Sequence, residues 1–314
     1  MLFYIFKRVL MTIPVMIVVA LFVFMMLRLS PGDPAAVIAG DYATAEDVER
    51  IREQLGLSEP IVVQFTKWLG QLVQGDLGTS IFSNKPVAEL IVQRIEPTML
   101  LALSTIVFAV LVAVPLGTLA AYRAGSWVDR FVMLFSVGGF SVPVFVLGYV
   151  LIYILSLKLK WLPVQGYRSP FTEGIGPFFA HITLPTLTLS VIFIALIARM
   201  TRASVIEVLE EDYVRTARAK GQSEFKVLMR HALRNAAVPI ITVIGIGIAL
   251  LIGGVVVTES VYNIPGLGRL VLDAVLARDY PIIQGLILFF SFIYIVLNLL
   301  IDLSYSLLDP RIRY

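Results

Sequence analysis

The sequence contains no cysteine and only two histidines among its 314 residues. The lack of cysteine excludes a disulfide framework, a thiolate metal site and a cysteine nucleophile. Charged residues make up only 15% of the chain, whereas soluble domains have about 25%. An ordinary soluble domain is therefore excluded as well.

Motifs for catalysis and nucleotide binding are also missing. The sequence has no G-x-x-x-x-G-K-[ST] loop for ATP, no G-x-S-x-G elbow and no H-E-x-x-H zinc motif. His181 and His231 are expected on opposite sides of a membrane, so they cannot share one site. We therefore expect a chain that is not an enzyme, with no cofactor, no metal and no nucleic-acid partner.

Apolar residues are abundant instead. They account for 58% of the chain, and the mean hydropathy is +0.89. A membrane-spanning helix needs roughly 20 mostly apolar residues. Six runs approach or exceed that length: residues 9–29, 99–122, 131–157, 182–198, 238–258 and 282–303. The sequence predicts an all-α polytopic membrane protein with six transmembrane helices.

The basic residues predict the orientation of these helices. Lys7 and Arg8 precede the first run as in a signal sequence, but the run is long enough to span and no Ala-x-Ala site follows. We expect residues 1–30 to form an uncleaved helix. With the N-terminus inside, more than half of the 25 lysines and arginines fall on the inner side, although Lys158 and Lys160 do not. Both termini are predicted to be cytoplasmic, with a tail from residue 306 to 314.

A long polar segment, residues 31–97, separates the first two spans. Thr44 with Asp47 can cap a helix there, and Pro60 and Pro86 can each open a further one. We expect a small extracytoplasmic helical subdomain. It serves either as a structural cap or as a surface for an extracytoplasmic partner.

Ionisable residues are scarce inside the spans. Asp302, with Asn298 one turn earlier, is the carboxylate placed well inside a terminal span, and we favour a structural role near its inner end. Gly245, Ala249 and Gly253 recur at every fourth residue, a pattern that favours close helix packing and can equally line a pathway for a bulky solute.

The second polar segment, residues 199–237, is predicted to be helix, glycine turn, helix. Val205, Leu209 and Tyr213 recur at helical spacing, and Gly221 should end that helix in a left-handed conformation. Ser223 can cap the second helix. An apolar stripe is expected there at Phe225, Leu228, Met229, Ala232 and Ala236, and a basic stripe at Lys226, Arg230 and Arg234.

This segment has two interpretations from composition alone. It is a pair of amphipathic helices on anionic headgroups, or it is a docking element for a cytosolic protein. The string E-D-Y-V-R-T-A-R-A-K-G, followed by H-A-L-R-N-A-A-V-P, favours the second. It closely resembles the cytoplasmic loop of dipeptide and oligopeptide permeases, the membrane subunits of binding-protein-dependent ABC importers in the peptide/nickel permease family.

The superfamily motif in this loop is Glu-Ala-Ala, three residues, Gly, nine residues, Ile, one residue, Leu-Pro. Here Gly221 takes the glycine place, and the residues at the Glu-Ala-Ala places are Arg215, Thr216 and Ala217. His231 stands at the Ile place. P-G-D-P, L-G-L-S-E-P, P-G-L-G and the terminal D-P-R-I-R-Y also resemble peptide permeases, so the resemblance runs from end to end.

The resemblance implies a type I ABC importer permease fold in a bacterial inner membrane, with a core domain over residues 98–305 that contains the coupling loop 199–237. It implies a homologous second permease, two ATPase subunits and an extracytoplasmic peptide-binding protein as partners. The contact with the ATPase is expected within residues 211–225. The residues singled out are Glu211, Asp212, Tyr213, Arg215, Thr216, Ala217, Arg218, Ala219, Lys220 and Gly221.

Two other classes of function stay open at this point. A secondary carrier or channel would move solute without nucleotide, and a membrane scaffold or receptor would move none. Within the transporter interpretation, the substrate can be a dipeptide, a longer peptide, glutathione or a nickel complex.

Overall fold

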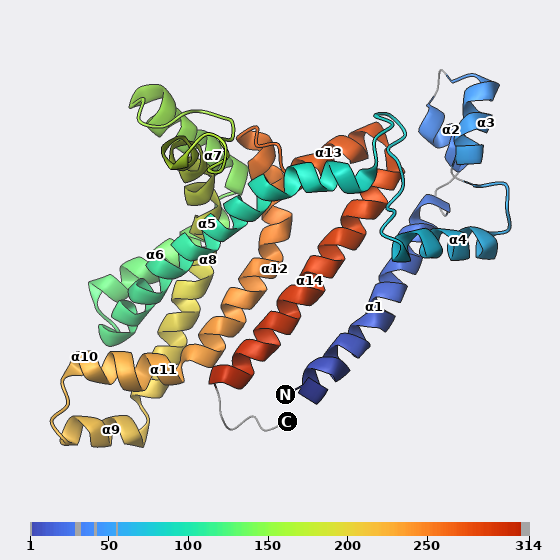
Figure 1. The fold of residues 1–314 in the computed structure, drawn as a ribbon. Coiled ribbons are helices and arrows are strands. Elements are labelled where there is room, and N and C mark those ends of the chain that lie inside the picture. Colours follow the sequence, from blue (N-terminus) through green and yellow to red (C-terminus); the bar gives the residue numbers. More distant parts are fainter. Residues whose placement is uncertain (1, 29–32, 41–42, 55, 309–314) are drawn as a thin grey trace. The chain divides into compact units, whose positions relative to one another are not determined.

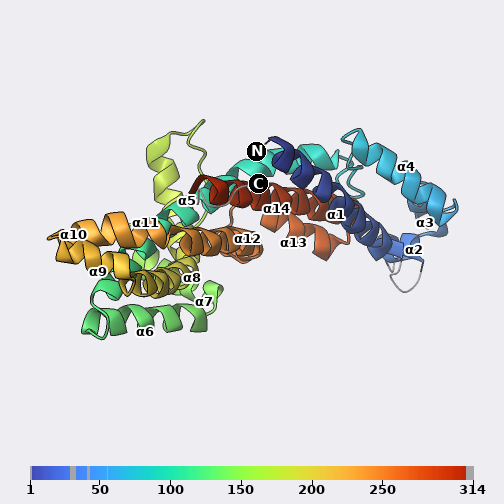
Figure 2. The same ribbon diagram turned by 90° about the horizontal axis from the view of Figure 1, so that it is seen from below.

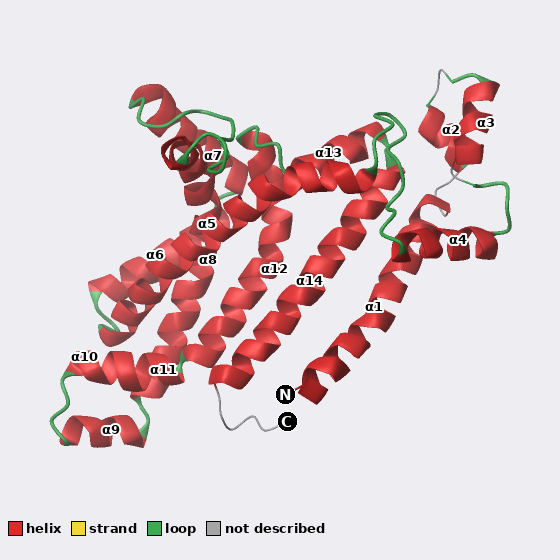
Figure 3. Ribbon diagram, in the orientation of Figure 1, coloured by secondary structure: helices red, strands yellow, loops and turns green. Residues whose placement is uncertain are grey.

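The computed structural model describes residues 2–28, 33–40, 43–54 and 56–308 (Figure 1). These residues form helices joined by loops and contain no strand, and Thr79 and Pro86 make an isolated antiparallel bridge (Figure 3). The predicted all-α class is confirmed.

Contacts divide the chain into two compact units. The first comprises Met1–Glu96 and Arg269–Val296, and the second Pro97–Gly268 and Leu297–Arg313. Helices α5 (Val87–Tyr122) and α14 (Tyr280–Leu308) contribute residues to both.

The first unit contains α1 (Leu2–Arg28), α2 (Pro34–Ala39), α3 (Ala45–Gln54), α4 (Ile61–Val73) and most of α13 (Leu267–Ala277). The predicted cap of α3 is confirmed, because Thr44 Oγ1 donates to the Asp47 carboxylate at 2.6 Å and the Asp47 N–H donates back at 3.2 Å. The hydrogen bond from the Thr44 side chain lowers the pKa of Asp47.

The helix predicted after Pro86 is confirmed at its start, but the prediction that it is separate from the second span is wrong. Helix α5 runs without interruption from Val87 to Tyr122 and contains Pro97 and Pro115. A proline removes one N–H from the helical ladder, but here it does not end the helix.

Two side-chain contacts hold the start of α14 in the first unit. Asp279, just before this helix, accepts a hydrogen bond from Ser80 Oγ at 2.6 Å, and Gln284 Nε2 donates to the Val23 carbonyl at 3.0 Å. Gly285 lies so close to Val87 that an added Cβ would be 2.7 Å from Val87 Cγ1. This part of α14 therefore packs against α1 and the beginning of α5.

The second unit is organised around α8 (Ile175–Leu209), which packs against α6, α7 and α12. The elements between α5 and α13 are α6 (Trp127–Ser141), α7 (Val144–Leu151), the π-helix η1 (Ile152–Lys158), α8, α9 (Asp212–Ala219), α10 (Glu224–Lys226), the π-helix η2 (Val227–Ala232), α11 (Leu233–Asn235) and α12 (Ala237–Val261). Leu184, Leu189 and Ile197 of α8 are buried in the largest hydrophobic cluster.

Three helices in the described part of the chain are long and apolar enough to cross a membrane: Val87–Tyr122, Ile175–Leu209 and Tyr280–Asp302. The number rises to five if each of two bent pairs is one span, and Leu10–Met26 is a shorter apolar helix. Each of the six predicted apolar runs falls on one of these elements.

The predicted span over residues 131–157 is divided between two helices. Trp127–Ser141 and Val144–Lys158 meet at an angle of 104°. Pro143 caps the second helix, and Val142 before it is extended, with φ −94° and ψ 123°. A residue before proline is disfavoured in the helical region, so the chain turns there.

Small residues allow close approach between the helices. Gly245 lies against Ile301 so tightly that a Cβ would overlap that side chain, which confirms close packing at this end of the predicted stripe; the surroundings of Gly253 lie outside the described residues. At Gly117 a Cβ would be 2.5 Å from the Ala198 carbonyl oxygen and 2.7 Å from Thr201 Cβ. Gly138 has nothing within 4 Å of the same position.

We predict that Gly117→Ala destabilises the purified protein, because overpacking at a helix contact costs roughly 1–3 kcal/mol. Gly138→Ala is the matched control, and it should be neutral or slightly stabilising because alanine has the higher helix propensity. The temperature at which each variant aggregates in detergent measures its stability. Equal melting of the two variants would contradict the close α5–α8 contact.

Candidate functional site

The predicted inner segment forms the end of α8 and a pair of short helices that returns the chain to α12. Figures 1 and 2 both show α9 beside the helical stretch α10, η2 and α11. We call residues 211–235 the hairpin. Because α8 leads into it and α12 follows it, the hairpin continues two core helices of the second unit.

The prediction of one helix through Val205, Leu209 and Tyr213 is wrong. Helix α8 ends at Leu209, and Glu211 is extended, with φ −67° and ψ 143°, as the N-cap of α9. Three consecutive carboxylates, residues 210–212, repel one another within a helix, whereas at the start of a new helix they meet the positive end of its dipole. The chain therefore breaks here and begins α9.

The predicted end of the first hairpin helix at Gly221 is confirmed. Gly221 has φ +77°, its N–H donates to the Arg218 carbonyl at 2.9 Å, and the Gln222 N–H donates to the Ala217 carbonyl at 3.3 Å. These two hydrogen bonds form a Schellman motif. A left-handed residue at this position favours glycine.

Side-chain hydrogen bonds connect the two arms of the hairpin. The Arg218 guanidinium donates to both carboxylate oxygens of Glu224, at 3.0 and 3.2 Å. His231 Nε2 lies 2.9 Å from Gln222 Oε1, and Asn235 Nδ2 donates to Tyr213 Oη at 2.9 Å. The hairpin is thus braced at its turn and at its open end.

The predicted apolar stripe of the second arm is only partly correct. Phe225 is 72% exposed and Met229 48% exposed, whereas Val227, Ala232 and Ala236 are buried. The cause is the π-helix over Val227–Ala232. Its i→i+5 hydrogen bonds widen the turn, so the buried face advances by five residues from Val227 to Ala232.

The outer surface of the hairpin carries apolar and basic side chains together. Tyr213, Phe225 and Met229 are exposed, and so is the predicted basic stripe. Of the ten residues singled out from the sequence, nine are exposed, and Ala217 is buried at 6% exposure. Large exposed apolar groups in a polar segment are typical of an interaction site.

Glu211 lies four residues before Arg215, a spacing that favours an ion pair within a helix, but this pair does not appear among the ion pairs of the described residues. Arg215 Nη1 instead lies 3.6 Å from Asp212 Oδ1, with both side chains strongly exposed. Such a pair adds little stability, so these charges remain available to a partner.

A buried ion pair that the sequence did not suggest connects α8 to α6. The Arg202 guanidinium donates to both carboxylate oxygens of Asp129, through Nε and, at 2.7 Å, through Nη2. The Gly125 N–H donates to the same carboxylate at 2.8 Å, and Asp129 is 5% exposed. In the sequence, the sign of this contact is that Asp129 stands just before the apolar run 131–157. The pair ties the last turns of α8 to α6 close to the hairpin.

A second buried carboxylate, Glu259, explains the glycine turn after α12. It is fully buried and accepts a hydrogen bond from Thr98 Oγ1 at 2.6 Å, and Thr98 Oγ1 accepts the Leu267 N–H at 2.8 Å. A Cβ at Gly266 would overlap the Glu259 carboxylate. Glycine is therefore needed at residue 266 for space.

Comparisons with known proteins agree with this architecture. The family described as binding-protein-dependent transport system inner membrane component matches residues 113–314, and its N-terminal counterpart matches residues 1–102. The chain belongs to this family. It is therefore a membrane component of a binding-protein-dependent transport system, as the resemblance of residues 211–239 predicted.

Curated relatives match over the whole length. The chain is 56% identical over 311 residues to the probable peptide ABC transporter permease protein y4tP of Sinorhizobium fredii, which covers 99% of both chains. It is 45% identical over 314 residues to the glutathione transport system permease protein GsiC of Escherichia coli, which covers 100% of both.

A solved structure supports the fold. An inward-facing structure of the MetNI methionine ABC transporter matches with a TM-score of 0.57 and 16% identity, over 70% of this chain and 96% of that chain. At this identity the likeness concerns the fold alone. The predicted ABC importer permease fold is confirmed.

The Asp129–Arg202 pair yields a prediction about stability. Asp129→Asn should lower the free energy of unfolding, by up to roughly 3–5 kcal/mol for a buried pair and by less where Arg202 reaches solvent. The double variant Asp129→Asn with Arg202→Gln should recover part of the loss, because no unpaired charge remains. Thermal aggregation in detergent is measured for the wild type, both single variants and the double variant. Strictly additive losses of stability would exclude direct coupling between Asp129 and Arg202.

Proposed function

We propose that this chain is the membrane-spanning subunit of an ATP-driven importer of di- or oligopeptides, coupled to its ATPase subunits through residues 211–225. The observation that carries the proposal is the braced hairpin at the junction of α8 and α12, with apolar and basic side chains on its outer surface. The names of the peptide and glutathione permeases that it resembles support a peptide substrate.

The coupling follows from how the hairpin is attached. Hydrogen bonds from Arg218 to Glu224 and from Asn235 to Tyr213 hold its arms together, so a force on its surface moves it as one body. That movement is delivered to α8 and α12 directly, and to α6 through Arg202 and Asp129. ATP binding and hydrolysis belong to the partner, since the chain has no P-loop.

The remaining parts of the proposal concern partners and orientation. A homologous second permease completes the pathway, two ATPase subunits bind the hairpins, and an extracytoplasmic binding protein delivers the peptide. Both termini and the hairpin lie in the cytoplasm of a bacterium, and the chain spans its inner membrane. The binding protein sets most of the choice among dipeptides, longer peptides, glutathione and nickel complexes.

Within the proposed contact, the exposed residues differ in role. Ala217 supports the hairpin from inside, while Glu211, Asp212, Tyr213, Arg215, Thr216, Arg218, Ala219, Lys220 and Gly221 reach the surface. Phe225 is the most exposed aromatic side chain of the hairpin, and aromatic anchors dominate binding energy at interfaces.

Gly221→Val tests the coupling role. Valine in a left-handed conformation costs roughly 1–2 kcal/mol, although nothing lies within 4 Å of the added Cβ. The variant should therefore insert normally but distort the turn. In proteoliposomes with the partner subunits, ATP-dependent peptide uptake should fall severalfold while ATP hydrolysis persists.

Two controls accompany this measurement. Gly75→Val imposes the same strain, with φ +83° and open space, in the first unit, and it should retain uptake. Gly221→Asn should keep most of the ATP-dependent uptake, because asparagine tolerates the left-handed region. Normal uptake by Gly221→Val would refute the coupling role, and uptake without nucleotide would indicate a carrier.

Phe225→Ala tests the docking surface. Loss of an exposed aromatic anchor should reduce the ATPase subunits that co-purify in mild detergent by about tenfold. Phe82→Ala removes an aromatic side chain that is exposed in the first unit and should have no effect. Equal recovery from the two variants would place the contact away from Phe225.

A further inference from the structure

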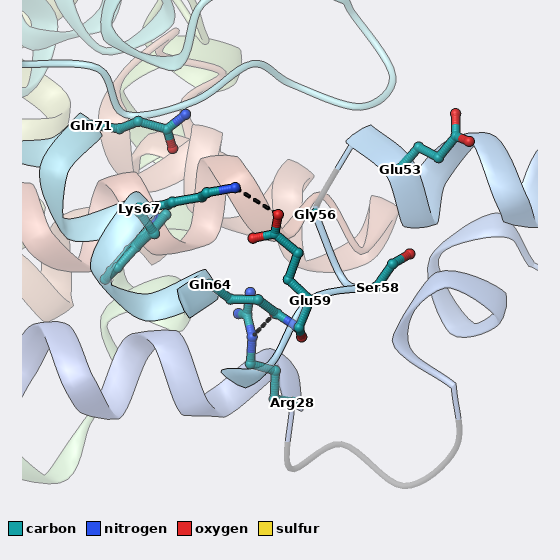
Figure 4. Close-up of a pocket in the computed structure, with 9 residues that line it drawn as sticks. Arg28, Glu53, Gly56, Ser58, Glu59, Gln64, Lys67 and Gln71 are labelled. Atoms are coloured by element: carbon teal, nitrogen blue, oxygen red, sulfur yellow. Dashed lines mark hydrogen bonds and ion pairs between the residues drawn. The ribbon is translucent and has the colours of Figure 1, made fainter. Parts of the chain in front are cut away.

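Helix α4 has two different faces, and the polar one lines a pocket. Gln64, Lys67 and Gln71 of α4 contribute to a pocket of about 560 Å³ that also includes Glu59 and Arg28 (Figure 4). Lys67 Nζ is paired with Glu59 Oε1 at 2.6 Å, and Gln64 Nε2 donates to the Glu59 carbonyl at 2.6 Å. This face of α4 therefore lines a space with polar groups.

The other face is apolar and largely uncovered. Val62 is 69% exposed and Val73 83% exposed, and Leu69 lies between them at helical spacing. None of the residues of α4 is buried. An apolar stripe exposed to water would favour aggregation. We therefore expect an apolar environment to cover it.

Helix α4 is fixed to the end of α1 by aromatic and polar contacts. The Phe24 ring lies 5.1 Å from that of Phe65 and 5.5 Å from that of Trp68. Arg28 Nε donates to Gln64 Oε1 at 2.9 Å, and its guanidinium lies 3.5 Å above the Phe24 ring. In Figure 1, α4 runs across the end of α1.

Helix α1, to which α4 is attached, also carries exposed apolar side chains. Val18 and Phe22 are strongly exposed on that helix, and in a membrane component such side chains face lipid. Phe65 belongs to the same face of α4 as Val62 and Leu69, and it touches α1 through Phe24. Helix α4 is therefore attached to a helix that itself exposes apolar side chains.

We propose that α4 is an interfacial helix that lies in the headgroup region of the membrane leaflet in which α1 ends. Its Val62, Leu69 and Val73 face the acyl chains, and its Lys67 side faces water. With 13 residues it measures roughly 20 Å, too short to cross a hydrocarbon core of about 30 Å. Trp68 and Lys67 are residue types typical of such helices.

This placement has a consequence for the first unit. The polar pocket on the other side of α4 then opens toward the aqueous phase. Arg28, at the end of α1, reaches Gln64 instead of pointing into lipid. Helix α4 thus fixes the height of the pocket above the bilayer, and this holds whatever solute the transporter carries.

The lack of cysteine in the chain allows a direct test with spin labels. Single variants Val62→Cys and Val73→Cys carry the label on the apolar stripe. Gln71→Cys carries it on the pocket side, and Val18→Cys on α1 serves as the lipid reference. The assembled transporter is reconstituted into liposomes, and label collisions with oxygen and with a water-soluble nickel chelate are measured.

We expect the labels at residues 62 and 73 to resemble the one at residue 18, with frequent oxygen collisions and few nickel collisions. The label at residue 71 should show the reverse. Nickel access at residues 62 and 73 equal to that at residue 71 would overturn the proposal in favour of water. Shielding from both reagents would overturn it in favour of a protein partner on this face.

Discussion

The close approach of neighbouring helices to α8 is the constraint on which the second unit depends. Lipid tails are as apolar as leucine, so helices in a bilayer associate through tight packing of small residues more than through the hydrophobic effect. Gly117 of α5, Gly139 of α6 and Gly247 of α12 each lie against α8, at Thr201, Ala195 and Phe193. Because α8 is held on several sides, a displacement at its end cannot be absorbed by bending alone.

Polar groups complete this packing where helices begin and end. Asp129 with Arg202 joins α6 to α8, and Glu259 with Thr98 joins α12 to α5. A buried charge is tolerated only with partners of good geometry, so both contacts specify one arrangement of the helices. The hairpin lies next to the first of them, which is why its position is tied to three helices.

The hairpin itself combines rigidity with exposure. Its arms are joined by Arg218 to Glu224 and by Asn235 to Tyr213, while Phe225 and Met229 remain uncovered. A surface that is preorganised loses little conformational entropy on binding. The same logic applies to α4, whose aromatic attachment to α1 leaves its valine stripe exposed in a fixed direction.

The sequence by itself determined the features whose causes are local. The apolar runs, the Thr44–Asp47 cap, the left-handed Gly221 and the family motif of the inner loop could all be predicted, because each depends on residues a few positions apart. The break between α8 and α9 is also local, but three adjacent carboxylates compete there with an apolar spacing that favours one helix. The prediction followed the helical spacing, whereas in the structure the helix ends at Leu209 and a new one begins at Asp212.

Tertiary structure decided the rest. The π-helix at Val227–Ala232 changes which side chains are buried, and a pattern based on 3.6 residues per turn cannot register a five-residue step. The sequence shows the proline at residue 143, but it does not show that the two helices meet there at an angle of 104°. The space requirement at Gly266 comes from the buried Glu259, and the pairing of Asp129 with Arg202 joins residues 73 positions apart. Such choices depend on which helices meet, and no local stretch of sequence contains that information.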